Sequence, residues 1–161
     1  MSEFLAKIEG AGLRPPKLVT LMMTNGCNLT CRHCWPESGS DELMQPVPAE
    51  ILQRLIHEMA GLEIQEICLT GGEPLTHPDW HRILSYACGR SAFKRITLQT
   101  NATLLDDNRV RKLNDIDCKG LVVQVSLEGA GPISHDHVKG EGSFKLALRG
   151  LKHLSEAGLG P

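Results

Sequence analysis

Short apolar segments alternate with amphipathic segments along nearly the whole chain of 161 residues. Each apolar segment has the length of a strand and ends at turn-forming residues, and the segment after it shows helical spacing of its apolar residues. The expected strands are 18–24, 66–70, 95–100 and 121–127. The expected helices begin at Pro48, Pro78, Asp106 and Ser143. Strict alternation of this kind predicts a parallel sheet with right-handed crossovers.

Four strand–helix units are fewer than the eight of a closed (β/α) barrel. The sequence therefore predicts an α/β fold, a partial TIM-like barrel with about four parallel βα units that is incomplete at the carboxyl end. We expect residues 18–161 to form this truncated core domain and residues 1–17 to form an amino-terminal lead-in. A fifth strand is expected to begin at residues 160–161. The open edge predicts a longer protein, or a second chain that completes the barrel.

The predicted helices each carry one apolar face. The helix after Pro48 is expected to bury Ile51, Leu52, Leu55, Ile56 and Met59, and the helix after Pro78 to bury Trp80, Ile83, Leu84 and Ala87. In the last helix, Ser143 is the expected cap, with Ala147, Leu148, Leu151 and Leu154 facing inward. These faces predict a helical layer packed against the sheet.

The bulk composition is that of an ordinary globular domain. Hydrophobic residues make up 41% and charged residues 22%, and the formal net charge is -2, without the basic excess of nucleic-acid-binding proteins. No stretch approaches the roughly 20 apolar residues of a membrane span, and the first 16 residues lack the apolar segment of a signal peptide. We therefore expect no nucleic-acid partner, no membrane span and a cytoplasmic location.

The six cysteines divide into a cluster of three and three separate residues. Cys68, Cys88 and Cys118 are scattered through predicted regular structure. A protein of a reducing compartment with one metal site explains this distribution better than a disulfide framework. We expect the scattered cysteines to be buried, small apolar side chains.

The clustered cysteines follow the first predicted strand directly, with the spacing Cys-x3-Cys-x2-Cys. They are Cys27, Cys31 and Cys34. Three thiolates can bind three irons of a cubane iron–sulfur cluster and leave the fourth iron open, whereas a closed zinc site needs four ligands. The loop therefore predicts an iron–sulfur cluster with one iron free for chemistry. A structural zinc site, with His33 as the fourth ligand, is an alternative.

The other three predicted strands also end in polar or glycine-rich segments. Gly71, Gly72, Glu73 and Pro74 follow the second strand, Asn101 follows the third, and Ser126 lies at the end of the fourth. Working residues of parallel α/β proteins gather at the carboxyl ends of the strands. We therefore expect these residues to share one site with the cysteine loop.

The cysteine spacing, together with Gly-Gly-Glu-Pro after the second strand, resembles the radical S-adenosylmethionine (SAM) superfamily. The Thr-Asn segment at 100–101, Ser-Leu-Glu-Gly at 126–129 and the run 138–144 are similar to its SPASM-like branch, which modifies peptides and builds peptide-derived or tetrapyrrole cofactors. The resemblance covers about residues 18–158. It implies that the three clustered cysteines bind a [4Fe–4S] cluster whose open iron holds SAM.

The resemblance also implies roles for the remaining residues. Gly71 and Gly72 would let the backbone come close to the ligand, and Glu73 would accept a hydrogen bond from the methionine ammonium group. Asn101 and Ser126 would bind the ribose or the methionine end, with a plain turn role as the alternative for Asn101.

Two further positions follow from the same resemblance. His33 would lie near the adenine, and a solvent-exposed loop position is its alternative. Lys139 stands where similar segments carry arginine, and it lacks the forked geometry with which arginine binds a carboxylate. His135 and His137 are expected to be loop residues at a helix entrance.

The chemistry implied is reductive cleavage of SAM to methionine and a 5′-deoxyadenosyl radical. The radical would abstract hydrogen from a peptide or cofactor-precursor substrate, and an external one-electron donor of the flavodoxin or ferredoxin type is implied. The alternative function is a truncated, non-catalytic iron–sulfur binding or electron-transfer module. The Gly-Gly-Glu-Pro turn favours the enzyme, because a plain electron carrier does not need it.

Overall fold

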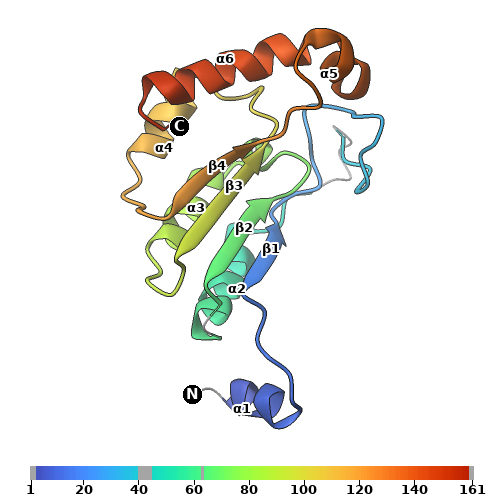
Figure 1. Cartoon of the computed structure of the whole chain (residues 1–161). Helices are drawn as coiled ribbons and strands as arrows, with labels where there is room; N and C mark the ends of the chain where they lie inside the picture. Colours follow the sequence, from blue (N-terminus) through green and yellow to red (C-terminus); the bar gives the residue numbers. More distant parts are fainter. Residues whose placement is uncertain (1–2, 40–44, 63, 160–161) are drawn as a thin grey trace.

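A computed structural model describes residues 3–39, 45–62 and 64–159. The strands β1 (Leu18–Met22), β2 (Glu66–Thr70), β3 (Arg95–Thr100) and β4 (Leu121–Val125) form one parallel sheet in the order β1-β2-β3-β4. The helices are α1 (Glu3–Gly10), α2 (Ala49–Gly61), the 3-10 helix η1 (Pro74–Thr76), α3 (Trp80–Cys88), α4 (Asp107–Asn114), α5 (Pro132–Lys139) and α6 (Ser143–Glu156). Figure 1 shows this α/β fold, which confirms the predicted partial barrel. The predicted fifth strand at 160–161 lies outside the described residues.

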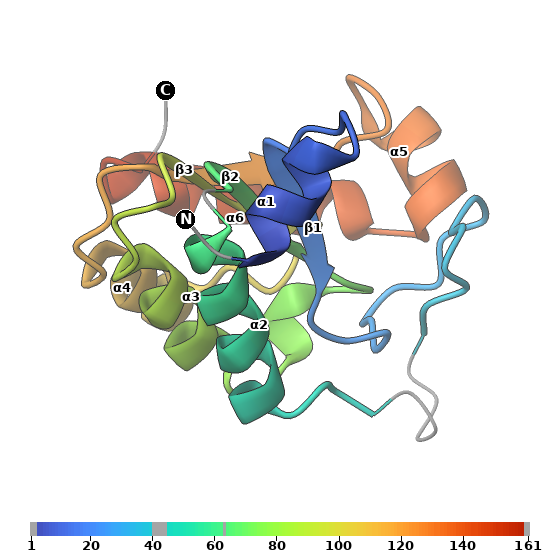
Figure 2. The same ribbon diagram turned by 90° about the horizontal axis from the view of Figure 1, so that it is seen from below.

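One face of the sheet is covered by helices. Figure 2 shows α2, α3 and α4 side by side on this face, as expected when every crossover has the same hand. Leu21, Leu69 and Leu98 lie in register on neighbouring strands and are buried beneath the helices. Burying a side chain of this size stabilises the fold by about 1.5–3 kcal/mol. The apolar strand segments and helix faces therefore close into one core.

The register brings all four strand ends to the same edge of the sheet. Met22 pairs with Thr70, and Thr100 pairs with Val125. The loops that follow the strands consequently meet at this edge, which lies at the top of the sheet in Figure 1. The predicted motifs are brought together there by parallel pairing alone.

Some predicted details are wrong. β1 and β4 each end two residues earlier than expected, so that Ser126 follows its strand instead of lying within it. Ile51 and Leu148, both expected to face the core, are 43% and 44% exposed. The apolar stripe of each helix is wider than its contact with neighbouring elements, so the residues at the margin of the stripe face solvent.

The segment before α6 also differs from the prediction. His135 and His137 lie within α5, which begins at a proline suited to the first turn of a helix. Ser143 does not cap α6: the Asp136 carboxylate accepts hydrogen bonds from the Gly142 N–H (2.9 Å), the Ser143 hydroxyl (3.0 Å) and the Phe144 N–H (2.7 Å). These hydrogen bonds, the one from Phe144 foremost, lower the pKa of Asp136. A carboxylate seven residues upstream therefore satisfies the free N–H groups that open α6.

Two of the scattered cysteines form a disulfide. Cys88, at the end of α3, is bonded to Cys118, which precedes β4, with their Cα atoms 5.3 Å apart. The prediction that both are unpaired side chains is wrong, because packing brings together two positions 30 residues apart in the sequence. Cys68 is free and buried, as predicted.

The predicted lead-in, residues 1–17, contains α1, which lies below the amino end of β1 in Figure 1. Across the described ranges, no helix combines the length and the apolar character needed to span a membrane.

Candidate functional site

A cavity of about 340 Å³ opens at the carboxyl edge of the sheet. This volume is within the range of small-molecule sites. Every predicted site residue except Pro74 lines it: Cys27, Cys31, His33, Cys34, Gly71, Gly72, Glu73, Asn101 and Ser126. Pro74 is buried at the start of η1, directly behind the turn. Tertiary structure thus gathers into one cavity residues that are up to 99 positions apart, from 27 to 126.

The glycine turn after β2 is bonded to the backbone of the cysteine loop. The Gly72 N–H donates to the Thr24 carbonyl (2.8 Å), and the Glu73 N–H donates to the Gly26 carbonyl (2.9 Å). A Cβ atom on Gly71 would overlap the Thr24 backbone, and one on Gly72 would overlap the Gly26 carbonyl. The close approach that these glycines allow is therefore to the cysteine loop itself, in addition to the cavity that they line.

The three cysteine thiols are half-buried, and those of Cys27 and Cys34 accept hydrogen bonds from the backbone. The Leu29 N–H donates to Cys27 Sγ (3.4 Å), and the Ser38 N–H donates to Cys34 Sγ (3.3 Å). Burial raises the pKa of the Cys27 and Cys31 thiols. Donors aimed at sulfur suit thiolates that carry negative charge, which is the form that binds metal.

The three thiols do not converge on one point. Within the described ranges, no three Cys, His, Asp or Glu side chains are grouped closely enough to hold a single metal ion. A zinc ion requires such convergence, whereas each thiolate of a cubane cluster binds a different iron. Three cysteines on one loop match the number of thiolates that a cubane cluster with one open iron uses.

Glu73 is fully buried and is held by three donors from the chain. Its Oε1 accepts from the Leu75 N–H (3.1 Å) and the Thr100 hydroxyl (2.7 Å), and its Oε2 accepts from the Asn101 N–H (2.7 Å). Burial raises the pKa of the Glu73 carboxyl, and these hydrogen bonds, with the charge of Lys139, oppose that rise. Since a carboxylate has about four acceptor positions, most of its capacity is used by the chain, and the bonds from Thr100 and Asn101 join the ends of β2 and β3. This role was not anticipated from the sequence.

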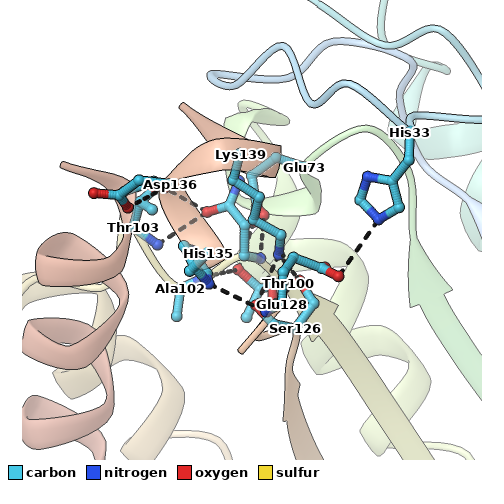
Figure 3. Close-up of polar contacts among 12 residues, drawn as sticks. His33, Glu73, Thr100, Ala102, Thr103, Ser126, Glu128, His135, Asp136 and Lys139 are labelled. Carbon is cyan, nitrogen blue, oxygen red and sulfur yellow. Dashed lines mark hydrogen bonds and ion pairs between the residues drawn. The ribbon is translucent and has the colours of Figure 1, made fainter. Parts of the chain in front are cut away.

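A second set of polar side chains lines the cavity near the end of β4. The Lys139 ammonium, only 4% exposed, donates to the Ser126 carbonyl (2.7 Å) and the Ser126 hydroxyl (2.5 Å), and it is 3.4 Å from Glu128 Oε1. His33 Nε2 lies 3.5 Å from the other oxygen of the same carboxylate. Figure 3 shows His33 facing Glu128, and Lys139 beside Ser126 and Glu128. The three N–H bonds of Lys139 are thus directed at groups of the chain itself.

Sequence reasoning did not predict Thr100 or Glu128 as site residues. The signal for Glu128 is its place in the Ser-Leu-Glu-Gly segment, directly beyond β4. For Lys139, the sequence showed a departure from arginine, and only the fold shows that its ammonium reaches back from α5 to Ser126. No sequence spacing indicates that contact.

The Radical SAM superfamily model matches residues 21–161, and the chain therefore belongs to the radical SAM superfamily. Among curated proteins, the chain is 36% identical over 143 residues to the AdoMet-dependent heme synthase of Methanosarcina barkeri, covering 88% of this chain and 40% of that protein. It is 32% identical over 151 residues to the mycofactocin maturase MftC of Mycobacterium ulcerans, covering 91% and 38%. These relatives confirm the predicted resemblance to the maturase branch. The chain spans less than half of the length of each.

Solved structures support the fold. SuiB of Streptococcus suis bound to S-adenosylmethionine superposes with a TM-score of 0.79 at 21% identity, covering 95% of this chain and 35% of that one. The anSMEcpe protein with bound AdoMet and a peptide gives a TM-score of 0.71 at 21% identity, covering 91% and 42%.

Proposed function

We propose that this chain is a radical SAM enzyme core that binds a [4Fe–4S] cluster and SAM in the cavity at the carboxyl edge of the sheet. The observation that carries this proposal is the shared cavity: three half-buried thiols and the Gly-Gly-Glu turn open into the same space. The domain that we assign to this function is residues 18–161, with residues 1–17 as a lead-in.

The cluster ligands in this proposal are Cys27, Cys31 and Cys34. The N–H donors to the sulfurs of Cys27 and Cys34 fit thiolates, the form of cysteine that binds iron. When bound, the cluster would supply the electron that cleaves SAM into methionine and a 5′-deoxyadenosyl radical. The groups of the chain that line the cavity would bind and orient SAM beside the cluster.

The SAM-binding residues in this proposal are those that line the rest of the cavity. They are Gly71, Gly72 and Glu73, with Pro74 behind them, and Ser126 and His33. The Gly-Gly-Glu turn presents backbone groups, because the Glu73 carboxylate is largely occupied by the chain. His33, whose side chain is 59% exposed, lines the cavity beside Glu128 and would contact the adenine there.

The partners in this proposal are a peptide or cofactor-precursor substrate and an external one-electron donor of the flavodoxin or ferredoxin type. A peptide substrate is supported by SuiB, which has been solved bound to the precursor peptide SuiA. The location in this proposal is the cytoplasm, where the three loop cysteines would stay reduced, although a disulfide such as Cys88–Cys118 is rare there. The open edge of the sheet leaves room for further strands or a second chain.

Anaerobic reconstitution with iron and sulfide, followed by dithionite and SAM, tests the function. We expect a brown protein with about four irons per chain that forms 5′-deoxyadenosine. Cys31→Ala should lose both properties. Cys68→Ala, which changes a cysteine outside the loop, is the matched control and should retain them.

The alternatives predict different results. A cluster that forms no 5′-deoxyadenosine favours the electron-transfer module. A colourless protein with one zinc per chain supports the structural zinc site.

A further inference from the structure

The orientation of the Asn101 side chain is fixed by its neighbours. Its Oδ1 accepts hydrogen bonds from the Thr103 N–H (2.9 Å) and the Thr103 hydroxyl (2.7 Å). A backbone N–H can only donate, so the carbonyl oxygen of the carboxamide must face Thr103. The amide nitrogen consequently faces the opposite way, towards the cysteine loop.

Both hydrogens of this amide have acceptors in the cysteine loop. Asn101 Nδ2 donates to Asn28 Oδ1 (3.0 Å) and lies 3.9 Å from Cys27 Sγ, a hydrogen-bond distance for sulfur. Asn28 also hydrogen-bonds Thr103, because its Nδ2 donates to the Thr103 hydroxyl (2.8 Å). The buried carboxamide is therefore fully occupied by the chain, with one N–H directed at a proposed cluster ligand.

The backbone around Asn101 is also constrained. Its own N–H donates to Glu73 Oε2 (2.7 Å), and the next residue, Ala102, has a φ of 63°, a conformation that non-glycine residues seldom adopt. Gly150 of α6 packs on the Ala102 carbonyl so closely that a Cβ atom there would overlap it. Such conformations persist where the surroundings hold them, often at functional sites.

We propose that Asn101 is a positioning residue that hydrogen-bonds the Cys27 thiolate and raises the reduction potential of the cluster, instead of contacting SAM. This inference rests on the proposed function for its cluster. Reduction adds negative charge that the cluster shares with its sulfur ligands, and an N–H donor stabilises the reduced form more than the oxidised form.

The potential of the reconstituted 161-residue chain, measured by EPR-monitored redox titration, tests this role. Asn101→Asp keeps an oxygen for Thr103 and puts a negative oxygen beside the thiolate. Asn101→Ala only removes the donor. We expect the potential to fall from wild type to Asn101→Ala to Asn101→Asp. At a fixed applied potential, the ratio of reduced to oxidised cluster should fall by up to about tenfold, which corresponds to about 59 mV for a one-electron couple.

Two further variants complete the design. Asn114→Asp makes the same substitution on the exposed end of α4, outside the cavity lining, and should leave the potential unchanged. Thr103→Val leaves Asn101 in place but removes one anchor of its carbonyl oxygen, and it should lower the potential by a smaller amount. If an Asn101 variant fails to fold, Thr103→Val still tests the role of Asn101. In folded variants, the affinity for SAM, read from the change in the cluster spectrum, should stay within twofold of wild type.

Equal potentials in wild type, Asn101→Ala and Asn101→Asp would overturn the inference, as would a large loss of SAM affinity at unchanged potential. A different result would refute the proposed function. A wild-type cluster that yields no 5′-deoxyadenosine refutes the enzyme, while the potentials of the same clusters still decide the role of Asn101.

Discussion

Replacing Glu73 by glutamine tests whether this carboxylate holds the site together. Oε1 accepts two hydrogen bonds, from Leu75 and Thr100, and Oε2 accepts one, from Asn101. A glutamine keeps the greater number of hydrogen bonds, the two from Leu75 and Thr100, when its side-chain oxygen takes the Oε1 position. Its NH₂ group then faces the Asn101 N–H, where two donors meet and neither has an acceptor.

The magnitude follows from these contacts. A buried donor left without an acceptor costs about 1–3 kcal/mol, and the two retained bonds lose the strengthening that a charged acceptor provides. Removal of a buried charge offsets part of this loss. We expect Glu73→Gln to lower the free energy of unfolding by about 1–3 kcal/mol, which is about 2–12 °C in melting temperature for a chain of this size.

Urea unfolding at pH 7, followed by circular dichroism, measures this difference. The matched control is Glu66→Gln on β2, whose side chain is 44% exposed and lies 3.9 Å from Arg95. An exposed ion pair contributes about 0–1 kcal/mol, so the control should change stability little. If Glu73→Gln is as stable as the control, the hydrogen bonds from Thr100 and Asn101 to Glu73 do not hold the ends of β2 and β3 together as inferred.

Three other substitutions follow from the structure. Gly72→Ala places a methyl group against the cysteine loop, and we expect a loss of about 1–3 kcal/mol and reduced iron content after reconstitution; full iron content would contradict this packing. The pKa of Asp136 is lowered in the folded state, so its stabilisation is present above the ordinary pKa of about 3.9 and is lost as the pH falls through the folded value. Asp136→Asn should therefore be less stable than wild type at pH 7, with the difference shrinking in acid titrations; a constant difference would refute the cap. Reduction of the disulfide of Cys88 should lower the unfolding free energy by about 3–4 kcal/mol in wild type and have no effect in Cys88→Ser, as urea unfolding with and without a thiol reductant can show.

Local patterns predicted those parts of the fold that depend on neighbours in the sequence. The alternating segments gave the four strands and their helices, because burial of one face imposes a period on the sequence. Parallel pairing then placed the strand ends on one edge, so the predicted motif residues were found together in the cavity. At the margin of a helix's apolar face, as at Ile51, the helical period alone predicted a buried side chain where the structure has an exposed one.

The sequence by itself therefore determined the parallel α/β fold, the family and which motifs line the cavity. Tertiary structure decided what those residues touch: the donors that surround Glu73, the amide of Asn101 turned towards Cys27, the reach of Lys139 to Ser126, and the Cys88–Cys118 disulfide. The physical reason is the distance along the chain over which each kind of interaction acts. Periodicity and turn chemistry act over a few residues, whereas a hydrogen bond to a buried group depends on the packing of elements that lie far apart in the chain.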